Sequence, residues 1–279
     1  MDKLWEITLG DLLDEMAEKY PDHDCVIYTD RPFRKTYGEF RDLVNLAAKG
    51  FLKLGIKKGD HVSIWATNYP EWLITMFATA KIGAVLVTVN TNYKIFEAEY
   101  LFKQSDTHTL VLIDGFKDTN YVDIVHQLVP EMRGKAPGTW ESKNLPYLKN
   151  VIYVGPGKHD GMMNFEQLYE LGQSVSDEEL AKVQKSLDVH DVINMQYTSG
   201  TTGFPKGVML THFNIVNNGK SIGDRMKFTH LDRLCIPVPL FHCFGCVLGV
   251  MACVTHGTTM VPVEYFSPLK VLEAISQEK

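Results

Sequence analysis

Eleven residues near the middle of the chain, YTSGTTGFPKG at 197–207, combine the residue types that bind phosphate groups. Glycines at 200, 203 and 207 let the main chain adopt positive φ and approach a ligand closely. Exposed N–H groups in such turns form an anion-binding nest, and Lys206 adds a full positive charge. Further hydrogen-bond donors are the hydroxyls of Thr198, Ser199, Thr201 and Thr202. Donors of this kind stabilise the charge that builds on a departing pyrophosphate.

The composition of this segment leaves a second interpretation open, a flexible glycine-rich surface turn. A Walker motif is excluded, because it needs four residues between a glycine and Gly-Lys-Ser/Thr, followed by a helix. Here Lys206 follows Pro205 and precedes Gly207.

The flanking residues predict that the segment joins two strands. Apolar Ile193, Met195 and Tyr197 alternate with polar residues, which indicates a strand that enters the loop. Residues 208–210 form a second extended run, and Thr211 is placed to cap a following helix.

The upstream sequence alternates amphipathic helices with short apolar strands. Helices are expected over 8–20, 40–52, 70–80, 96–104, 121–128 and 177–187, and strands over 61–66, 85–89, 109–113 and 151–154. Thr36 and Glu39 form a capping box before the second helix, and Pro70 opens the third. This alternation predicts an α/β fold of layered, largely parallel sheets flanked by helices.

The bulk composition is that of a globular protein. The chain has 279 residues, 45% hydrophobic and 22% charged, with a formal net charge of −6. The acidic balance argues against nucleic acid as a partner. The charged N-terminus lacks a signal-peptide core, and five scattered cysteines fit the reducing cytoplasm.

Residues 234–263 carry no charged side chain, and a stretch of this length could span a membrane. Prolines, glycines, histidines and threonines within them favour a buried strand, loop and core helix instead. A membrane protein stays the remaining alternative, and peripheral membrane association is left open. Cys243 and Cys246 form a Cys-x-x-Cys pair. Zinc would need two more ligands, which Cys253, His242 and His256 could supply. The sequence has no second Cys-x-x-Cys pair and the surroundings are apolar, so ordinary buried thiols are the favoured interpretation.

Three stretches together resemble the adenylate-forming superfamily, in its fatty acyl-CoA synthetase branch. They are TSGTTGFPKG at 198–207, PLFHCFG at 239–245 and NYPEWLITMFATAKIGAVLVTVNTNY at 68–93. The resemblance covers essentially the whole chain and implies the N-terminal part of the large domain of such an enzyme. Family members use ATP and Mg²⁺ to convert a carboxylate to an acyl-adenylate, and the thiol of coenzyme A, a co-substrate, then displaces AMP.

The resemblance also implies roles for individual residues. Lys206 and His242 would be catalytic, and a neutral His242 would donate a hydrogen bond to the carboxylate. The hydroxyl of Thr202 or Thr201 would lie near magnesium. The phosphates would be bound by Thr198, Ser199, Gly200, Thr201, Thr202, Gly203, Pro205 and Lys206. The acid would contact Phe241, His242, Cys243 and Cys246.

The chain also departs from the family pattern. It has no Tyr-Gly-x-Thr-Glu segment for magnesium, no Thr-Gly-Asp for the ribose and no C-terminal domain with its catalytic lysine. We therefore expect residues 1–279 to be an incomplete N-terminal adenylation domain that is inactive alone. Two alternatives stay open: an aryl-CoA or carrier-protein acylating ligase, and a non-catalytic nucleotide-binding or interaction module.

Overall fold

The computed structural model describes residues 3–198 and 205–279. Within them, the larger sheet has seven strands in the order β11-β10-β4-β3-β5-β8-β9. All neighbours are parallel except β10 and β11, which are antiparallel. Along the chain the strands are β3 (His61–Trp65), β4 (Val85–Thr88), β5 (Thr109–Leu112), β8 (Asn150–Tyr153), β9 (Met163–Asn164), β10 (Val192–Thr198) and β11 (Lys206–Thr211).

A second sheet of four strands, in the order β12-β13-β1-β2, brings together the two ends of the described chain. Its members are β1 (Asp24–Tyr28), β2 (Phe33–Thr36), β12 (Arg233–Ile236) and β13 (Thr259–Pro262). β12, β13 and β1 are parallel, and β2 runs antiparallel to β1. A small hairpin of β6 (Gly115–Phe116) and β7 (Thr119–Asn120) stands apart from both sheets.

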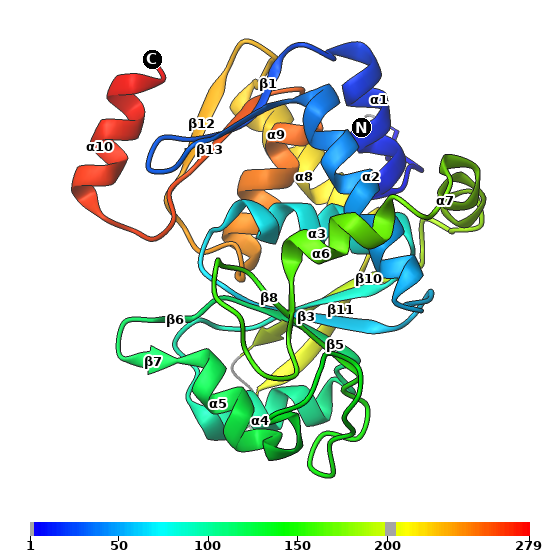
Figure 1. Cartoon of the computed structure of the whole chain (residues 1–279). Coiled ribbons are helices and arrows are strands. Elements are labelled where there is room, and N and C mark those ends of the chain that lie inside the picture. The colour runs from blue at the N-terminus through cyan, green and yellow to red at the C-terminus, as the bar shows by residue number, and fades with distance from the viewer. Residues whose placement is uncertain (1–2, 199–204) are drawn as a thin grey trace.

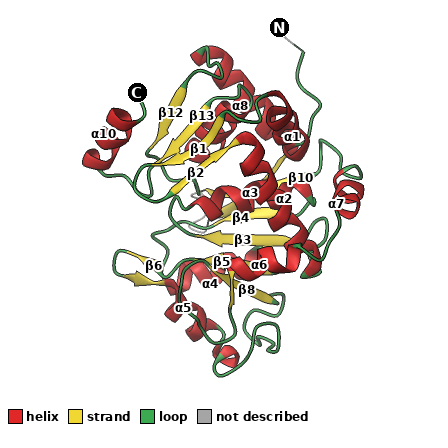
Figure 2. Ribbon diagram, turned by 45° about the horizontal axis from the view of Figure 1, so that its top comes forward, coloured by secondary structure: helices red, strands yellow, loops and turns green. Residues whose placement is uncertain are grey.

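The helices separate and cover the sheets (Figures 1 and 2). Helices α2 (Tyr37–Lys53) and α3 (Pro70–Lys81) lie between the sheets, and α4 (Ile95–Gln104) and α5 (Tyr121–Leu128) cover the far side of the larger sheet. The remaining helical segments are α1 (Leu9–Lys19), η1 (Pro130–Met132), α6 (Phe165–Gly172), α7 (Asp177–Gln184), α8 (His212–Met226), the π-helical η2 (Phe244–Met251), α9 (Ala252–Val254) and α10 (Pro268–Gln277).

Helix α3 is buried nearly all round, although its sequence predicted a single apolar face. Two of its threonines bond within the helix: the Thr75 hydroxyl donates to the Glu71 carbonyl at 2.6 Å, and that of Thr79 to the Thr75 carbonyl at 2.8 Å. Lys81, only 1% exposed, bonds to the Asp14 carboxylate at 2.6 Å. A helix with no solvated face must lie between layers, which accounts for its place between the sheets.

Most predicted elements are confirmed within one to three residues. The capping box of Thr36 and Glu39 is present, and Pro70 occupies the first turn of α3. The charge-free stretch 234–263 forms a strand, a loop and a core helix as expected, with β13 in addition. Across residues 3–198 and 205–279, no helix is long and apolar enough to cross a membrane. Strands β1 and β2 and helix α6 were not predicted.

His212, the first residue of α8, is fully buried and gives the fold a pH dependence. Its Nδ1 accepts the main-chain N–H of Leu9 at 3.0 Å, while Nε2 is buried without a partner among the described residues. Burial lowers the pKa of His212 from 6.5 to about 4. The unfolded chain therefore binds more protons than the native one between these pH values, and stability is fully present only above pH 6.5.

We predict that the free energy of unfolding falls by roughly 3 kcal/mol, from this group alone, as the pH drops from 6.5 to about 4. Substituting His212→Asn keeps an acceptor for the Leu9 N–H and removes the titration, so its stability should fall less over this range. Urea unfolding at pH values from 4 to 7.5 measures both proteins. Equal slopes would contradict the assignment.

Candidate functional site

The two ends of the predicted phosphate-binding segment meet at the end of an antiparallel strand pair. Thr198 ends β10, Lys206 begins β11, and the two are register partners. Both residues are exposed. The prediction that the segment joins two strands is confirmed. Ser199, Gly200, Thr201, Thr202 and Gly203, predicted to bind phosphate, lie outside the described residues.

Helix α4 holds the base of this segment. The Tyr100 hydroxyl donates to the Pro205 carbonyl at 3.3 Å, and the Tyr197 hydroxyl donates to the side-chain carbonyl of Gln104. Burial raises the pKa of Tyr197, so its hydroxyl stays protonated and keeps donating. Gly207 does not have the positive φ that the sequence analysis assigned to it. It packs closely against the preceding strand, where a Cβ would lie 2.9 Å from the Met195 sulfur and that side chain would have to shift.

The histidine of the second motif is exposed at the start of η2. Its Nδ1 accepts the main-chain N–H of Phe244 at 3.2 Å. A neutral ring whose Nδ1 is an acceptor carries its proton on Nε2. His242 can therefore donate a hydrogen bond from Nε2, as a ligand carboxylate would require.

The cysteines beside this histidine have different surroundings. Cys243 is exposed, whereas Cys246 is fully buried and its sulfur accepts a hydrogen bond from Gln196 Nε2 at 3.3 Å. Burial raises the pKa of Cys246 to about 12, which keeps the thiol protonated. Cys246 thus packs against β10. This contact places the histidine motif at 239–245 beside the strand that leads into the predicted phosphate-binding segment.

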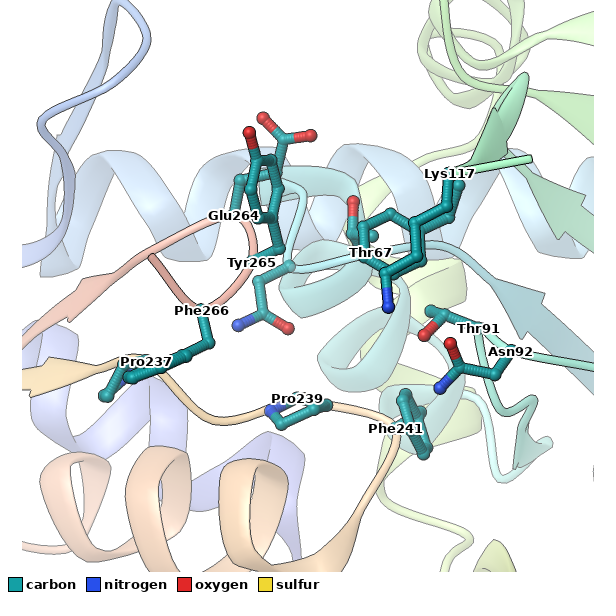
Figure 3. Close-up of a pocket in the computed structure, with 12 residues that line it drawn as sticks. Thr67, Thr91, Asn92, Lys117, Pro237, Pro239, Phe241, Glu264, Tyr265 and Phe266 are labelled. Carbon is teal, nitrogen blue, oxygen red and sulfur yellow. The ribbon is translucent and has the colours of Figure 1, made fainter. Parts of the chain in front are cut away.

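A pocket of about 650 Å³ opens at the carboxyl ends of strands from both sheets (Figure 3). Thr67 follows β3, Thr91 follows β4, Pro237 follows β12 and Glu264 follows β13. Open α/β sheets bind ligands at this edge. The aromatic walls are Phe116, Phe241, Tyr265 and Phe266. Of the predicted substrate residues, the pocket includes Phe241; His242, Cys243 and Cys246 do not line it.

Polar groups also line this pocket, between the aromatic side chains (Figure 3). The hydroxyl of Thr67, a residue 5% exposed, has no hydrogen-bond partner in the described part of the chain, so a ligand could satisfy it. Glu264 is held by Arg31, whose Nη2 lies 2.6 Å from Oε2, and the Arg31 guanidinium lies 4.0 Å from the Tyr69 ring centre. Lys117 adds a positive charge from the β6–β7 hairpin.

These polar groups were not predicted from the sequence. The signal was the position of Thr67 and Thr91 just after strands 61–66 and 85–89, because carboxyl ends of parallel strands meet at one edge. In residues 3–198 and 205–279, no three His, Cys, Asp or Glu side chains are grouped to hold a metal ion. Thr202, expected near magnesium, is outside that range.

Comparison with known proteins gives concordant results. The pattern of the family described as AMP-binding enzyme matches residues 13–279. The putative acyl-CoA synthetase YngI of Bacillus subtilis is 53% identical over 279 residues, which are 100% of this chain and 51% of that protein. The mitochondrial medium-chain acyl-CoA ligase ACSF2 of Danio rerio is 39% identical over 98% of this chain and 45% of its own length. The chain therefore spans about half the length of these curated relatives.

Solved structures share the fold. A long-chain-fatty-acid-CoA ligase, FadD1, from Archaeoglobus fulgidus has a TM-score of 0.79 at 25% identity, covering 99% of this chain and 51% of that one. The inhibitor-bound N-terminal domain of FACL13 from Mycobacterium tuberculosis has a TM-score of 0.77 at 24% identity, covering 98% and 61%. The predicted fold class is thus confirmed.

The turn that carries His242 is tight, and we predict that Gly245→Ala destabilises the protein by about 1–3 kcal/mol. A Cβ at 245 would lie 2.3 Å from the Pro239 carbonyl oxygen, a main-chain atom that cannot rotate away. Gly249→Ala is the matched control in the same helix, since its Cβ would meet only the Ile236 side chain, at 3.2 Å. Thermal unfolding compares the two; equal effects would contradict the predicted clash.

Proposed function

We propose, because this chain belongs to the AMP-binding enzyme family, that it forms the first half of an ATP-dependent ligase joining a carboxylic acid to coenzyme A. The observation that carries the proposal is the hydrogen bond between Gln196 and Cys246 at 3.3 Å. Gln196 lies two residues before Thr198, and Cys246 lies four after His242. The strand that leads into the proposed phosphate-binding segment therefore lies beside the histidine motif, which supports a transfer between ATP and a carboxylate at this place.

Each part of this site has a chemical role in the proposal. The N–H and hydroxyl groups of 198–203 and the Lys206 ammonium bind the β- and γ-phosphates of ATP. His242 donates from Nε2 to the carboxylate, which orients an oxygen towards the α-phosphate. Loss of pyrophosphate leaves an acyl-adenylate, from which the thiol displaces AMP. The Thr202 hydroxyl would contact Mg²⁺, which would neutralise negative charge on the phosphates.

A fatty acid is the proposed substrate. Phe241 and its aromatic neighbours offer apolar contact beside His242, and the names of the relatives include medium-chain acyl-CoA ligase. Residues 1–279 form an incomplete N-terminal adenylation domain in this proposal, and the second half of the relatives' length would complete the site. Five cysteines, all without disulfide bonds, support a cytoplasmic protein.

Pyrophosphate exchange into ATP tests the function, with octanoate, palmitate and benzoate as the acids. We predict acid-dependent exchange in a chain extended to the length of the relatives, fastest with a fatty acid, and none in residues 1–279 alone. Fastest exchange with benzoate would favour an aryl-CoA ligase. ATP binding without exchange in either protein would favour a nucleotide-binding module.

Lys206→Ala should lower exchange by the extended chain about 10²-fold or more, because a charge aimed at the transferring phosphates is lost. Lys206→Arg should retain more of the activity. Lys182→Ala, an exposed lysine on α7, is the control and should have no effect. Initial rates at varied ATP measure the change. A Lys206→Ala variant with unchanged rates would remove the assigned role.

A further inference from the structure

Asn68 lies where β3 leads into α3, and only 2% of it is exposed. Its Nδ2 donates to the carbonyls of Val238 and Val263, both at 2.9 Å. Its Oδ1 accepts the main-chain N–H of Leu240 at 2.8 Å. Both amide hydrogens and the oxygen are thus used inside the protein, which fixes the orientation of the group.

These bonds join three chain segments that are far apart in sequence. Asn68 follows β3 of the larger sheet, while Val238 and Val263 follow β12 and β13 of the smaller one. The main-chain N–H of Asn68 also donates to the Glu264 carbonyl at 2.9 Å. One side chain therefore ties the carboxyl ends of both sheets at the pocket.

The same bonds hold the turn that carries His242. Val238 and Leu240 flank Pro239, whose carbonyl accepts the His242 N–H at 3.3 Å. The His242 carbonyl in turn accepts the N–H groups of Gly245 at 2.9 Å and Cys246 at 3.2 Å. Asn68 thus binds the residues on both sides of Pro239. A shift of the Asn68 side-chain amide would move Pro239, and the hydrogen bond from the His242 N–H to the Pro239 carbonyl would transmit that movement to His242.

We propose that Asn68 is a positioning residue for His242. By holding the main chain at Val238 and Leu240, it sets where the imidazole Nε2–H points. The consequence for catalysis rests on the proposed function, whereas the consequence for the imidazole itself does not. If the Asn68 amide had only a structural role, its replacement would lower the stability of the protein and leave the tautomer of His242 unchanged.

Asn217 on α8 is a matched control. It is 9% exposed, and its side chain also makes three bonds: Oδ1 accepts from the Trp5 N–H at 2.7 Å, and Nδ2 donates to the Trp5 and Phe213 carbonyls at 2.9 Å each. Asn217→Leu therefore removes the same number of bonds from a buried amide that makes no bond to the His242 turn.

The first experiment uses this chain labelled with ¹⁵N-histidine. The ring nitrogens of His242, assigned with His242→Gln, report the tautomer and its titration. We expect the Nδ1 acceptor signature of His242 to be lost in Asn68→Leu and kept in Asn217→Leu. Unchanged His242 signals in folded Asn68→Leu would overturn the proposal. If Asn68→Leu does not fold, Asn68→Asp replaces it in the experiment, because an aspartate keeps an acceptor for the Leu240 N–H but loses both donors. Unchanged His242 signals in Asn68→Asp would also overturn the proposal.

The second experiment measures octanoate-dependent exchange in the extended chain. Asn68→Leu should lower kcat/KM for octanoate about 10- to 100-fold while the KM for ATP changes about twofold or less, as expected for a misplaced group. Equal loss in Asn217→Leu would overturn the positioning role. Absence of exchange in the wild-type extended chain would count against the proposed function, and the histidine spectra would still decide the role of Asn68.

Discussion

The burial of α3 between two sheets is the constraint on which the rest of the structure depends. A helix of 12 residues with almost no solvated side needs apolar partners in every direction. The larger sheet supplies them through β3 and β4, and α1 and α2 supply the others. Because α3 starts at the carboxyl end of β3, this packing also places the ends of β12 and β13 at its entrance, where Asn68 binds them.

This geometry explains why the pocket lies where it does. Parallel strands leave loops at their carboxyl ends, and here two sheets direct such loops to one place. Residues 67, 91, 237 and 264 each stand one to three positions beyond a strand. Together they line one pocket, although nearly 200 residues of sequence separate the first from the last. The two sheets thus bring sequence-distant groups to a fixed separation at the pocket.

Most local signals in the sequence predicted their elements correctly, whereas pairings between distant segments were missed. The capping box of Thr36 and the proline at 70 depend on neighbours within four residues, so both could be predicted. Strand β1 is five residues long, and it pairs with β13, more than 200 residues away. No residue pattern near Asp24–Tyr28 indicates the pairing with β13. Helix α6 was detectable, because Asn164 and Gln167 form a capping box that the sequence analysis overlooked.

The same limit applies to the candidate site. The motifs predicted the two strands that flank the predicted phosphate-binding segment, and they singled out Phe241, which lines the pocket. They could not say that Cys246 packs under β10, because that depends on how η2 sits against the sheet. The polar groups of the pocket carry no motif at all. Thr67 follows a strand of the larger sheet and Glu264 one of the smaller sheet, so only the packing of the two sheets brings them together.

Two histidines show how the fold gives one residue type different roles. Both His212 and His242 accept a main-chain N–H at Nδ1, so each neutral ring carries its proton on Nε2. In His212 that nitrogen is buried without a partner in the described chain, which lowers the pKa to about 4 and makes the ring a structural link to Leu9. His242 is exposed, so its Nε2–H can reach a ligand. Exposure, which a single sequence does not record, decides which of the two can take part in chemistry.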